Sequence, residues 1–258
     1  MELRRTIARL LAKAGYFTMR KIAPAIYAQD GLLSVHSHDF MQDPLFKRAY
    51  ERGVKAIGGG DDYQWHWRIH IGLWVAFSAS KLEGDFVECG VNKGFMSSAI
   101  MQRLDWDSID KQFYLLDTFS GLDNRFVSDD EVRTGALEKN ASQLKSAFYS
   151  VDIESVRANF SQWRNVRIIP GTVPLTLEKV DAEKIAYLHL DMNCAPPEIA
   201  AITFFWPRLV PGAFVLLDDY AYFGYRAQKL ALDAFAAERN LQICSLPTGQ
   251  GLLVKPPR

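Results

Sequence analysis

The chain has 258 residues, of which 48% are hydrophobic, enough for the core of one sizeable α/β domain with an extension. Its 30 basic and 30 acidic residues cancel to a net charge of zero, so we expect no general electrostatic attraction to nucleic acid. The three widely spaced cysteines have neither disulfide nor metal-ligand spacing, and no apolar run reaches the length of a membrane span, which predicts a cytoplasmic protein.

Residues 1–60 are predicted to form a helical N-terminal extension or cap. Apolar residues recur there at helical spacing, at Leu3, Ile7, Leu10 and Leu11, with basic residues between them. Most apolar stripes of this kind are packing faces, so we expect this one to contact its own domain or a second subunit, most simply in a homodimer. The alternative is peripheral contact with a membrane or with an anionic substrate.

Residues 61–258 alternate between strand-like and helical patterns, after a flexible joint at Gly58–Gly60 and a helical stripe from Trp65 to about Leu82. The predicted strands are 86–88, 112–116, 166–169, 185–190 and 213–217; the predicted helices are 95–104, 151–163, 196–209 and 225–239. Segments 240–246 and 252–255 are predicted to form a final hairpin. This order predicts a doubly wound α/β fold with a mostly parallel sheet of seven strands.

Residues 118–150 form one long polar connection between two predicted elements. Such a long connection within a compact domain is often a lid or a binding segment, so we expect a lid-like insertion. A solvated surface loop is an equally good interpretation.

The segment Gly84–Gly94 joins a predicted strand to the helix that follows it. Glu88 precedes Gly90 by two residues, Gly94 follows four residues later, and glycine lets the backbone approach a ligand closely. This spacing differs from the dinucleotide fingerprint, which disfavours a nicotinamide oxidoreductase. An acid before the first glycine suits a cationic group or a ribose, both of which S-adenosylmethionine offers. The alternative interpretation is a buried strand with a glycine turn.

Acidic residues follow several of the predicted strands, at Glu88, Asp117, Asp191 and the pair Asp218 and Asp219. Ligands of open parallel sheets bind outside the carboxyl ends of the strands, so these side chains are expected to converge on one crevice. Asp117 is placed to accept hydrogen bonds from ribose hydroxyls. Asp191, Asp218 and Asp219 together predict an oxygen cage that suits Mg²⁺. The alternative is that these aspartates cap the following helices.

Five segments, in this order, resemble the TylF-type macrocin O-methyltransferase family: Gly84–Gly94, Leu115–Leu122, Ile168–Thr172, Leu188–Asp191 and Pro211–Tyr220. The resemblance covers roughly residues 63–255. It implies a class I, Rossmann-like methyltransferase fold, S-adenosylmethionine as the methyl donor, and Mg²⁺-dependent methylation of a sugar or phenolic hydroxyl.

The resemblance also implies which residues form the site. The cofactor-binding residues would be Glu88, Gly90, Val91, Asn92, Gly94, Asp117, Thr118 and Phe119. The metal ligands would be Asp191, Asp218 and Asp219. Asp191 is then placed to accept the proton of the acceptor hydroxyl, directly or through water, so we expect it to be the catalytic base. The family usually has an Asp and a Tyr where this chain has Asn193 and Ala195, so the acceptor pocket is expected to differ.

We therefore expect an O-methyltransferase that acts on a hydroxyl of a sugar or glycan. A phenolic natural product is the alternative acceptor. A non-catalytic, methyltransferase-like binding protein is disfavoured because it would not need all of these carboxylates. His189 is a candidate base, although a core histidine is the more common role for such a residue. His66 and His70, one helical turn apart, lack a third metal-type neighbour and are expected to be structural.

Overall fold

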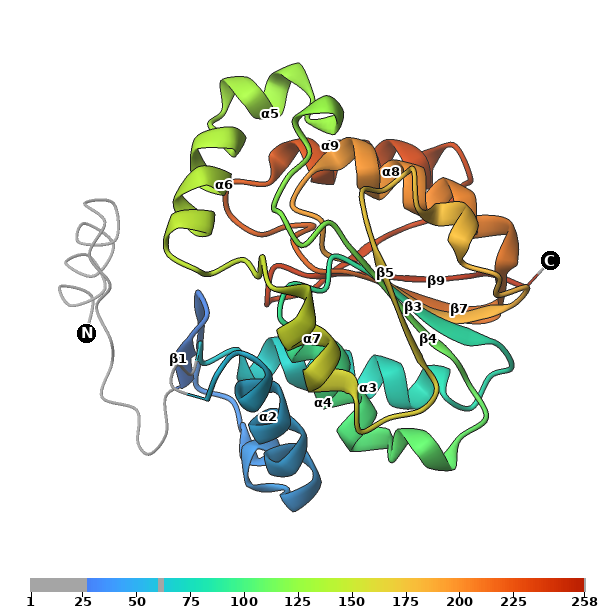
Figure 1. Ribbon diagram of the computed structural model, residues 1–258. Coiled ribbons are helices and arrows are strands. Elements are labelled where there is room, and N and C mark those ends of the chain that lie inside the picture. Colours follow the sequence, from blue (N-terminus) through green and yellow to red (C-terminus); the bar gives the residue numbers. More distant parts are fainter. Residues whose placement is uncertain (1–26, 60–62, 258) are drawn as a thin grey trace, which may run out of the picture.

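The computed structural model describes residues 27–59 and 63–257, which are drawn in colour in Figure 1. The predicted apolar stripe from Leu3 to Leu11 lies outside the described residues, and so does the subunit contact that depends on it.

The core of the described chain is one sheet of seven strands in the order β5-β4-β3-β6-β7-β9-β8. The strands are β3 (Asp85–Cys89), β4 (Phe113–Asp117), β5 (Val166–Pro170), β6 (Ile185–Leu190), β7 (Leu209–Leu217), β8 (Cys244–Ser245) and β9 (Gly251–Val254). Strands β3 to β7 pair in parallel, whereas β9 is antiparallel to both β7 and β8. The predicted doubly wound, mostly parallel sheet with an antiparallel edge is confirmed.

Helices cover both faces of this sheet (Figure 1). On one face lie α2 (Pro44–Ala56), α3 (His66–Ala79), α4 (Phe95–Leu104) and α7 (Ile153–Phe160); on the other lie α8 (Ala195–Phe205) and α9 (Arg226–Ala237). Short 3-10 turns occur at 39–42, 106–108, 124–126, 177–179 and 206–208. None of the helices in the described part of the chain is long and apolar enough to cross a membrane.

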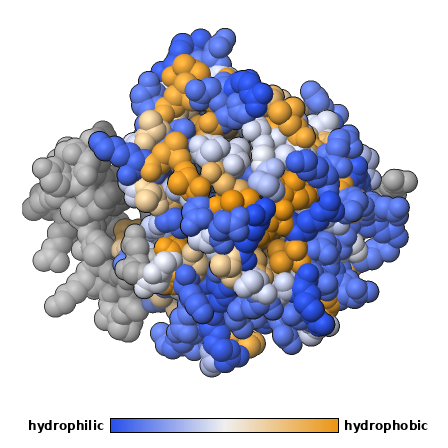
Figure 2. All heavy atoms as spheres, in the orientation of Figure 1, coloured by the Kyte–Doolittle hydropathy of each residue, from blue (hydrophilic) through white to orange (hydrophobic). Residues whose placement is uncertain are grey.

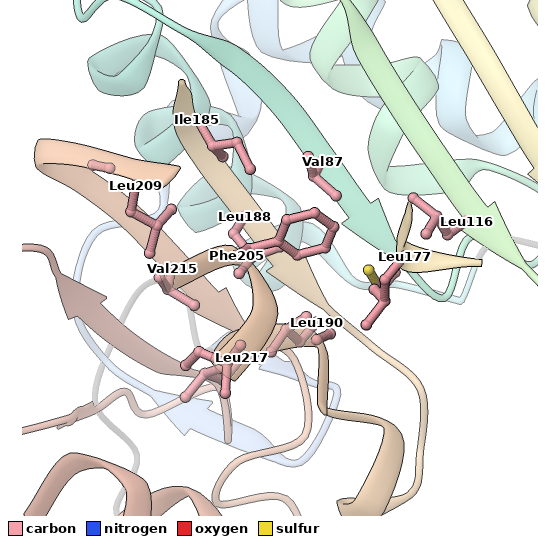
Figure 3. Packing of buried hydrophobic residues seen from close by; sticks show 14 of the residues in the cluster. Val87, Leu116, Leu177, Ile185, Leu188, Leu190, Phe205, Leu209, Val215 and Leu217 are labelled. Atoms are coloured by element: carbon pink, nitrogen blue, oxygen red, sulfur yellow. The ribbon is translucent and has the colours of Figure 1, made fainter. Parts of the chain in front are cut away.

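Two apolar layers hold the sheet between its helices. Val87, Leu188 and Val215 pack toward Phe205 of α8, as Figure 3 shows. Their strand neighbours, such as Phe86 and Leu216, point to the opposite layer, which includes α3 and α4. Because both faces of a parallel sheet are covered, its strands are nearly continuous apolar runs rather than alternating ones. At the surface drawn in Figure 2, hydrophobic residues gather in the middle and hydrophilic residues cover the lower and right-hand edges.

The sequence order of the strands reverses between β3 and β6, which are neighbours in the sheet. The chain continues from β3 outward to β4 and β5, then returns to β6 and proceeds outward to β7. Loops on the two sides of this point leave in opposite directions and open a crevice at the carboxyl ends of the strands. The acidic residues predicted from the sequence lie at these ends.

The described part of the predicted helical extension, residues 27–59, contains two strands as well as a helix. Residues 27–34 form an antiparallel hairpin of β1 (Tyr27–Gln29) and β2 (Leu32–Ser34), and α2 follows. The turn residues Asp30 and Gly31 have φ angles of +47° and +70°. A two-residue Asp-Gly turn with positive φ at both positions matches the right-handed twist of a hairpin, so the local sequence favours strands here over a helix.

The polar connection 118–150 is largely helical, with α5 (Asp129–Arg133) and α6 (Ala136–Lys145). Ser128 and Glu131 form a capping box at the start of α5, which satisfies two backbone N–H groups that would otherwise lack partners. Helix α6 begins after Gly135, whose φ is +89°. The insertion is therefore a folded element beside α9 rather than a loop (Figure 1).

We predict that Phe205→Ala lowers the free energy of unfolding by about 3–5 kcal/mol, because it opens a cavity in a fully buried layer. Phe223→Ala is the matched control: the side chain of Phe223 is 97% exposed, and its loss should cost under about 0.5 kcal/mol. Urea denaturation of both variants measures the difference. Equal losses would contradict the packing described for α8.

Candidate functional site

A cavity of about 430 Å³ opens at the carboxyl ends of the strands. Its wall contains most of the site residues expected from the sequence: Glu88, Gly90, Val91, Asn92, Asp117, Thr118, Asp191, Asp218 and Asp219. Gly94 and Phe119 lie behind the wall. A Cβ on Gly94 would come within 2.5 Å of the Phe160 ring, and the backbone N–H of Phe119 donates to Asp117 at 2.7 Å. These two residues support the cavity from outside it.

Gly90 allows the ends of β3 and β6 to meet at the floor of the cavity. Its φ is +92°, and a Cβ at this position would lie 1.8 Å from the carbonyl oxygen of Asp191. The backbone N–H of Asp191 in turn donates to the carbonyl of Cys89 at 2.8 Å. Only glycine combines this φ with so close an approach.

The Asp117 carboxylate accepts hydrogen bonds from the glycine loop, which is the segment 90–94 between β3 and α4. Its Oδ2 accepts hydrogen bonds from the backbone N–H groups of Val91 and Asn92, at 2.7 and 2.8 Å, and its Oδ1 accepts from that of Phe119. Each carboxylate oxygen can accept two hydrogen bonds, so Oδ1 keeps capacity for one more. Asp117 therefore both shapes the loop and retains an acceptor in the cavity wall.

Asn92 connects the glycine loop to the end of the 118–150 insertion. Its side-chain Nδ2 donates to the carbonyl of Phe148 at 3.1 Å, and its Oδ1 accepts from the backbone N–H of Ser150 at 2.7 Å. Nζ of Lys93 donates to the carbonyl of Ala147 at 2.7 Å. The Asn92 amide thus holds the segment after α6 against the loop.

Glu88 and His189 form a buried pair from adjacent strands. His189 Nδ1 lies 2.9 Å from Glu88 Oε1, and its Nε2 lies 3.6 Å from Asp218 Oδ1, which is too long for a hydrogen bond. Burial alone would lower the pKa of His189, but the Asp218 and Glu88 carboxylates outweigh it and raise that pKa to about 10. A protonated imidazole is no base at neutral pH. Oε2 of Glu88 is buried and has no hydrogen-bond partner within the described residues.

Asp191, Asp218 and Asp219 occupy neighbouring positions in the cavity wall but differ in their partners. Asp218 Oδ2 accepts from Arg68 at 2.5 Å, and its Oδ1 accepts from Gln250 at 2.9 Å. Although burial acts in the opposite direction, Arg68 and His189 hold the pKa of Asp218 below its usual range.

Asp191 and Asp219 have weaker partners. Burial and the Asp218 charge raise the pKa of Asp219 to about 7, and burial with both neighbouring carboxylates raises that of Asp191. Asp191 Oδ1 accepts from Asn193 at 3.3 Å, and Asp219 Oδ1 lies 3.8 Å from Arg68 Nη1. Within residues 27–59 and 63–257, no three His, Cys, Asp or Glu side chains are already arranged as ligands of one metal ion.

The alternative interpretation of these aspartates as helix caps is wrong. The N-cap residue of α8 is Cys194 and that of α9 is Tyr225, and neither helix has a side-chain cap. The aspartates follow β6 and β7 directly and face the cavity instead.

Arg68 and Asp30 line the same cavity and were not expected from the sequence. Arg68 Nε donates to Asp30 Oδ2 at 3.1 Å, and Asp30 lies at the hairpin turn between β1 and β2. An Asp-Gly pair between two apolar segments is a hairpin signal and would have placed Asp30 at a turn. No pattern along the sequence would have paired it with Arg68.

The insertion docks on the cavity through α5 and α6. Glu131 of α5 accepts a hydrogen bond from the backbone N–H of Ala195, the first residue of α8, at 2.6 Å. Lys139 of α6 donates to the Tyr225 hydroxyl, which donates to Asn193. Asn193, one of the two departures from the family pattern, thus joins the insertion to Asp191.

The two helical histidines, His66 and His70, pack among aromatic side chains and are not part of the cavity wall. His66 Nδ1 lies 2.6 Å from Gln29 Oε1, and the ring stacks on Tyr50. His70 stacks on Phe40 with ring centres 4.0 Å apart.

The sequence profile of the macrocin O-methyltransferase (TylF) family matches residues 75–244. The mycinamicin III 3''-O-methyltransferase of Micromonospora griseorubida is 29% identical over 145 residues, covering 53% of this chain and 55% of that protein. A tetracenomycin 4'-O-methyltransferase of Streptomyces olivaceus, named for a dimethoxy-rhamnosyl substrate, is 31% identical over 152 residues, covering 55% of each chain. This chain thus spans about half the length of these relatives.

Two solved structures share the fold. The O-methyltransferase NovP superimposes with a TM-score of 0.67 at 20% identity, covering 85% of this chain and 98% of NovP. The calicheamicin methyltransferase CalS11 gives a TM-score of 0.53 at 15% identity, covering 85% and 94%. The described sheet and its helices therefore form the class I methyltransferase fold.

We predict that Gly90→Ala destabilises the protein more than Gly224→Ala. Both glycines have a φ near +95°, but the added methyl group would meet no atom within 4 Å at Gly224 and a backbone oxygen at 1.8 Å at Gly90. The strained φ alone should cost about 1–2 kcal/mol. Urea denaturation separates the two effects, and equal free-energy losses would show that the contact at Gly90 has no energetic weight.

Proposed function

Because the chain belongs to the macrocin O-methyltransferase (TylF) family, we propose that it transfers the methyl group of S-adenosylmethionine to a hydroxyl of a sugar or glycan. The observation that carries this proposal is the cavity at the carboxyl ends of the strands, where the glycine loop and three aspartates share one wall. The tetracenomycin O-methyltransferase relative, which is named for a rhamnosyl substrate, supports a sugar as the acceptor.

The cofactor would bind at the β3 and β4 ends of the cavity. Oε1 of Glu88 faces His189, but its buried Oε2 has no hydrogen-bond partner among the described residues. A buried acceptor without a donor is costly, so this oxygen suits the ammonium or sulfonium group of S-adenosylmethionine. The remaining acceptor capacity of Asp117 Oδ1 suits a ribose hydroxyl. Gly90 also lines this part of the cavity.

The acceptor would bind beside Asp191 and Asp219, under the helical insertion. Aromatic side chains line this cavity together with the carboxylates, namely Tyr63, Trp65, Phe148, Tyr149, Tyr222 and Tyr225. Apolar ring faces and a few polar groups suit a sugar, which presents both C–H faces and hydroxyls. The same aromatic wall favours a phenolic acceptor as the second candidate.

In the proposed reaction the acceptor oxygen forms a bond to the methyl carbon as the carbon–sulfur bond breaks, which leaves S-adenosylhomocysteine. Asp191 takes the hydroxyl proton, directly or through water. The cavity wall holds the acceptor oxygen in line with the methyl group and sulfur, and this positioning supplies much of the acceleration.

Mg²⁺ fits the carboxylates of Asp191 and Asp219. Their raised pKa values reflect burial and repulsion that strong donors do not compensate, and oxygen ligands of this kind suit Mg²⁺. When bound there, Mg²⁺ would lower the pKa of the acceptor hydroxyl and of the neighbouring carboxylates. Asp218 is adjacent, and each of its oxygens accepts one hydrogen bond, from Arg68 or Gln250, and keeps capacity for a metal ion.

We predict that Asp117→Ala weakens S-adenosylmethionine binding at least tenfold, since it removes a ribose acceptor and frees the backbone of the glycine loop. Asp110→Ala, at an exposed position, is the control and should bind normally. Isothermal titration calorimetry measures both affinities. Unchanged affinity in Asp117→Ala would remove this residue from the cofactor site.

We predict that the protein forms S-adenosylhomocysteine from S-adenosylmethionine when a rhamnosylated or other sugar-bearing natural product is supplied. Excess chelator should abolish turnover, and Mg²⁺ should restore it. Asp191→Asn should lower kcat by about a hundredfold to ten-thousandfold, as expected for a lost general base. Cofactor binding should survive in this variant because Glu88 and Asp117 are unchanged. Full turnover in excess chelator would contradict the metal dependence, and turnover with phenols alone would favour the second candidate.

A further inference from the structure

A chain of hydrogen bonds connects the helical insertion to Asp191. Lys139 of α6 donates to the hydroxyl of Tyr225, and that hydroxyl donates to Oδ1 of Asn193. Nδ2 of Asn193 then donates to Asp191 Oδ1 at 3.3 Å. All four residues line the cavity. Resting on the proposed function, we propose that Lys139 and Tyr225 are positioning residues, which orient the Asn193 amide so that it donates to the proposed base.

The direction of each hydrogen bond follows from the first donor. A lysine ammonium can only donate, so the Tyr225 oxygen accepts from Lys139 and its O–H remains to donate. Only the oxygen of the Asn193 amide can accept from this O–H. With Oδ1 facing Tyr225, the NH₂ group of Asn193 is left for Asp191. The cation of α6 thus selects one of the two orientations of the amide.

Tyr225 suits the middle position of this chain of hydrogen bonds. Burial, reinforced by neighbouring groups such as Asp219, raises the pKa of Tyr225, so the hydroxyl keeps the proton that it donates. Lys139 Nζ also lies 3.8 Å from the centre of the Tyr225 ring, where a cation is attracted to the π-system. The Tyr225 side chain therefore holds the ammonium group through both its hydroxyl and its ring.

Position 193 needs an amide for this arrangement. The family usually has an aspartate here, and an ionised carboxylate has no hydrogen to donate to Asp191. Asn193 has a φ of +55°, in the left-handed region that asparagine adopts more readily than most residues. The donor beside Asp191 is therefore a feature of this sequence rather than of the family.

The same hydrogen bonds make the surroundings of Asp191 depend on the docking of the insertion. Lys139 lies in α6, Tyr225 directly precedes α9, and Asn193 lies between β6 and α8, so three separate segments meet here. Asp191 Oδ1 accepts one hydrogen bond from the amide and keeps capacity for a proton or a metal ion. The amide therefore orients the carboxylate without blocking it.

The test is hydrogen exchange of the Asn193 side-chain amide, followed by NMR in the full-length chain with isotope-labelled asparagine, without cofactor, acceptor or metal. The Asn193 signal is identified by its absence in Asn193→Ser. Asp191→Ala should speed the exchange about twofold to tenfold, the effect of losing one ordinary hydrogen bond. Asp219→Ala is the matched control: it removes a neighbouring carboxylate to which the amide does not donate, and the rate should be unchanged.

Tyr225→Phe and Lys139→Met should each speed the exchange by a similar factor, because either change removes a group that orients the amide. Lys139→Arg should retain the slow exchange, since arginine also only donates. Lys145→Met is the control for Lys139→Met, because Lys145 is an exposed lysine of the same helix outside the cavity wall. Its exchange rate should equal that of the unaltered chain.

Unchanged exchange in Asp191→Ala, Tyr225→Phe or Lys139→Met would overturn the proposal, and so would unprotected exchange in the unaltered chain. Equal acceleration in Lys139→Arg and Lys139→Met would also overturn it. Circular dichroism checks that each variant is folded, and the two Lys139 variants decide the matter if Tyr225→Phe is not. These measurements need neither cofactor nor acceptor. S-adenosylmethionine titration of the unaltered chain therefore distinguishes failure of this proposal from failure of the methyltransferase proposal.

Discussion

Mutual repulsion among buried carboxylates is the constraint on which the rest of this cavity depends. The strands of a parallel sheet end on one edge, so acidic residues at the carboxyl ends of β3, β4, β6 and β7 are brought together whether or not their charges are compatible. A buried ionised group costs several kcal/mol unless it is paired. The surrounding segments therefore supply hydrogen-bond donors and positive charges to these carboxylates.

The carboxylates have different partners, and these partners determine which carboxylate oxygens a ligand can contact. Asp117 is satisfied mainly by backbone N–H groups of the glycine loop, and Glu88 by the imidazolium of His189. Asp218 is satisfied by Arg68. Asp191 and Asp219 are left with the least compensation, so the distribution of donors, rather than the number of acids, decides which oxygens remain available.

The N-terminal hairpin and the 118–150 insertion contribute further side chains around the cavity. The hairpin supplies Asp30, which fixes Arg68, and α5 supplies Glu131, which accepts from the first N–H of α8. A carboxylate at a helix N-terminus also interacts favourably with the helix dipole. The N-terminal hairpin and the helical insertion consequently both contribute to the wall of the cavity.

The sequence by itself determined the class of fold and the location of the site. Alternation of strand and helix patterns implies a doubly wound sheet, and Gly90 and Asp117 mark a candidate ligand loop. Both signals are local, and the topology of such sheets places strand ends together. The Asp-Gly pair at residues 30 and 31 is an equally local turn signal, and in the structure it places a hairpin within the extension that is predicted to be helical.

Only the tertiary structure decided which partner each side chain takes. Arg68 meets Asp218 across 150 positions and Asp30 across 38, and Asn92 reaches Phe148 across 56. Such pairings depend on how α3, β7, the hairpin and the insertion pack, and periodicity along the chain carries no information about them. For the same reason, three aspartates that are equivalent in the sequence become one paired and two poorly compensated carboxylates in the folded protein.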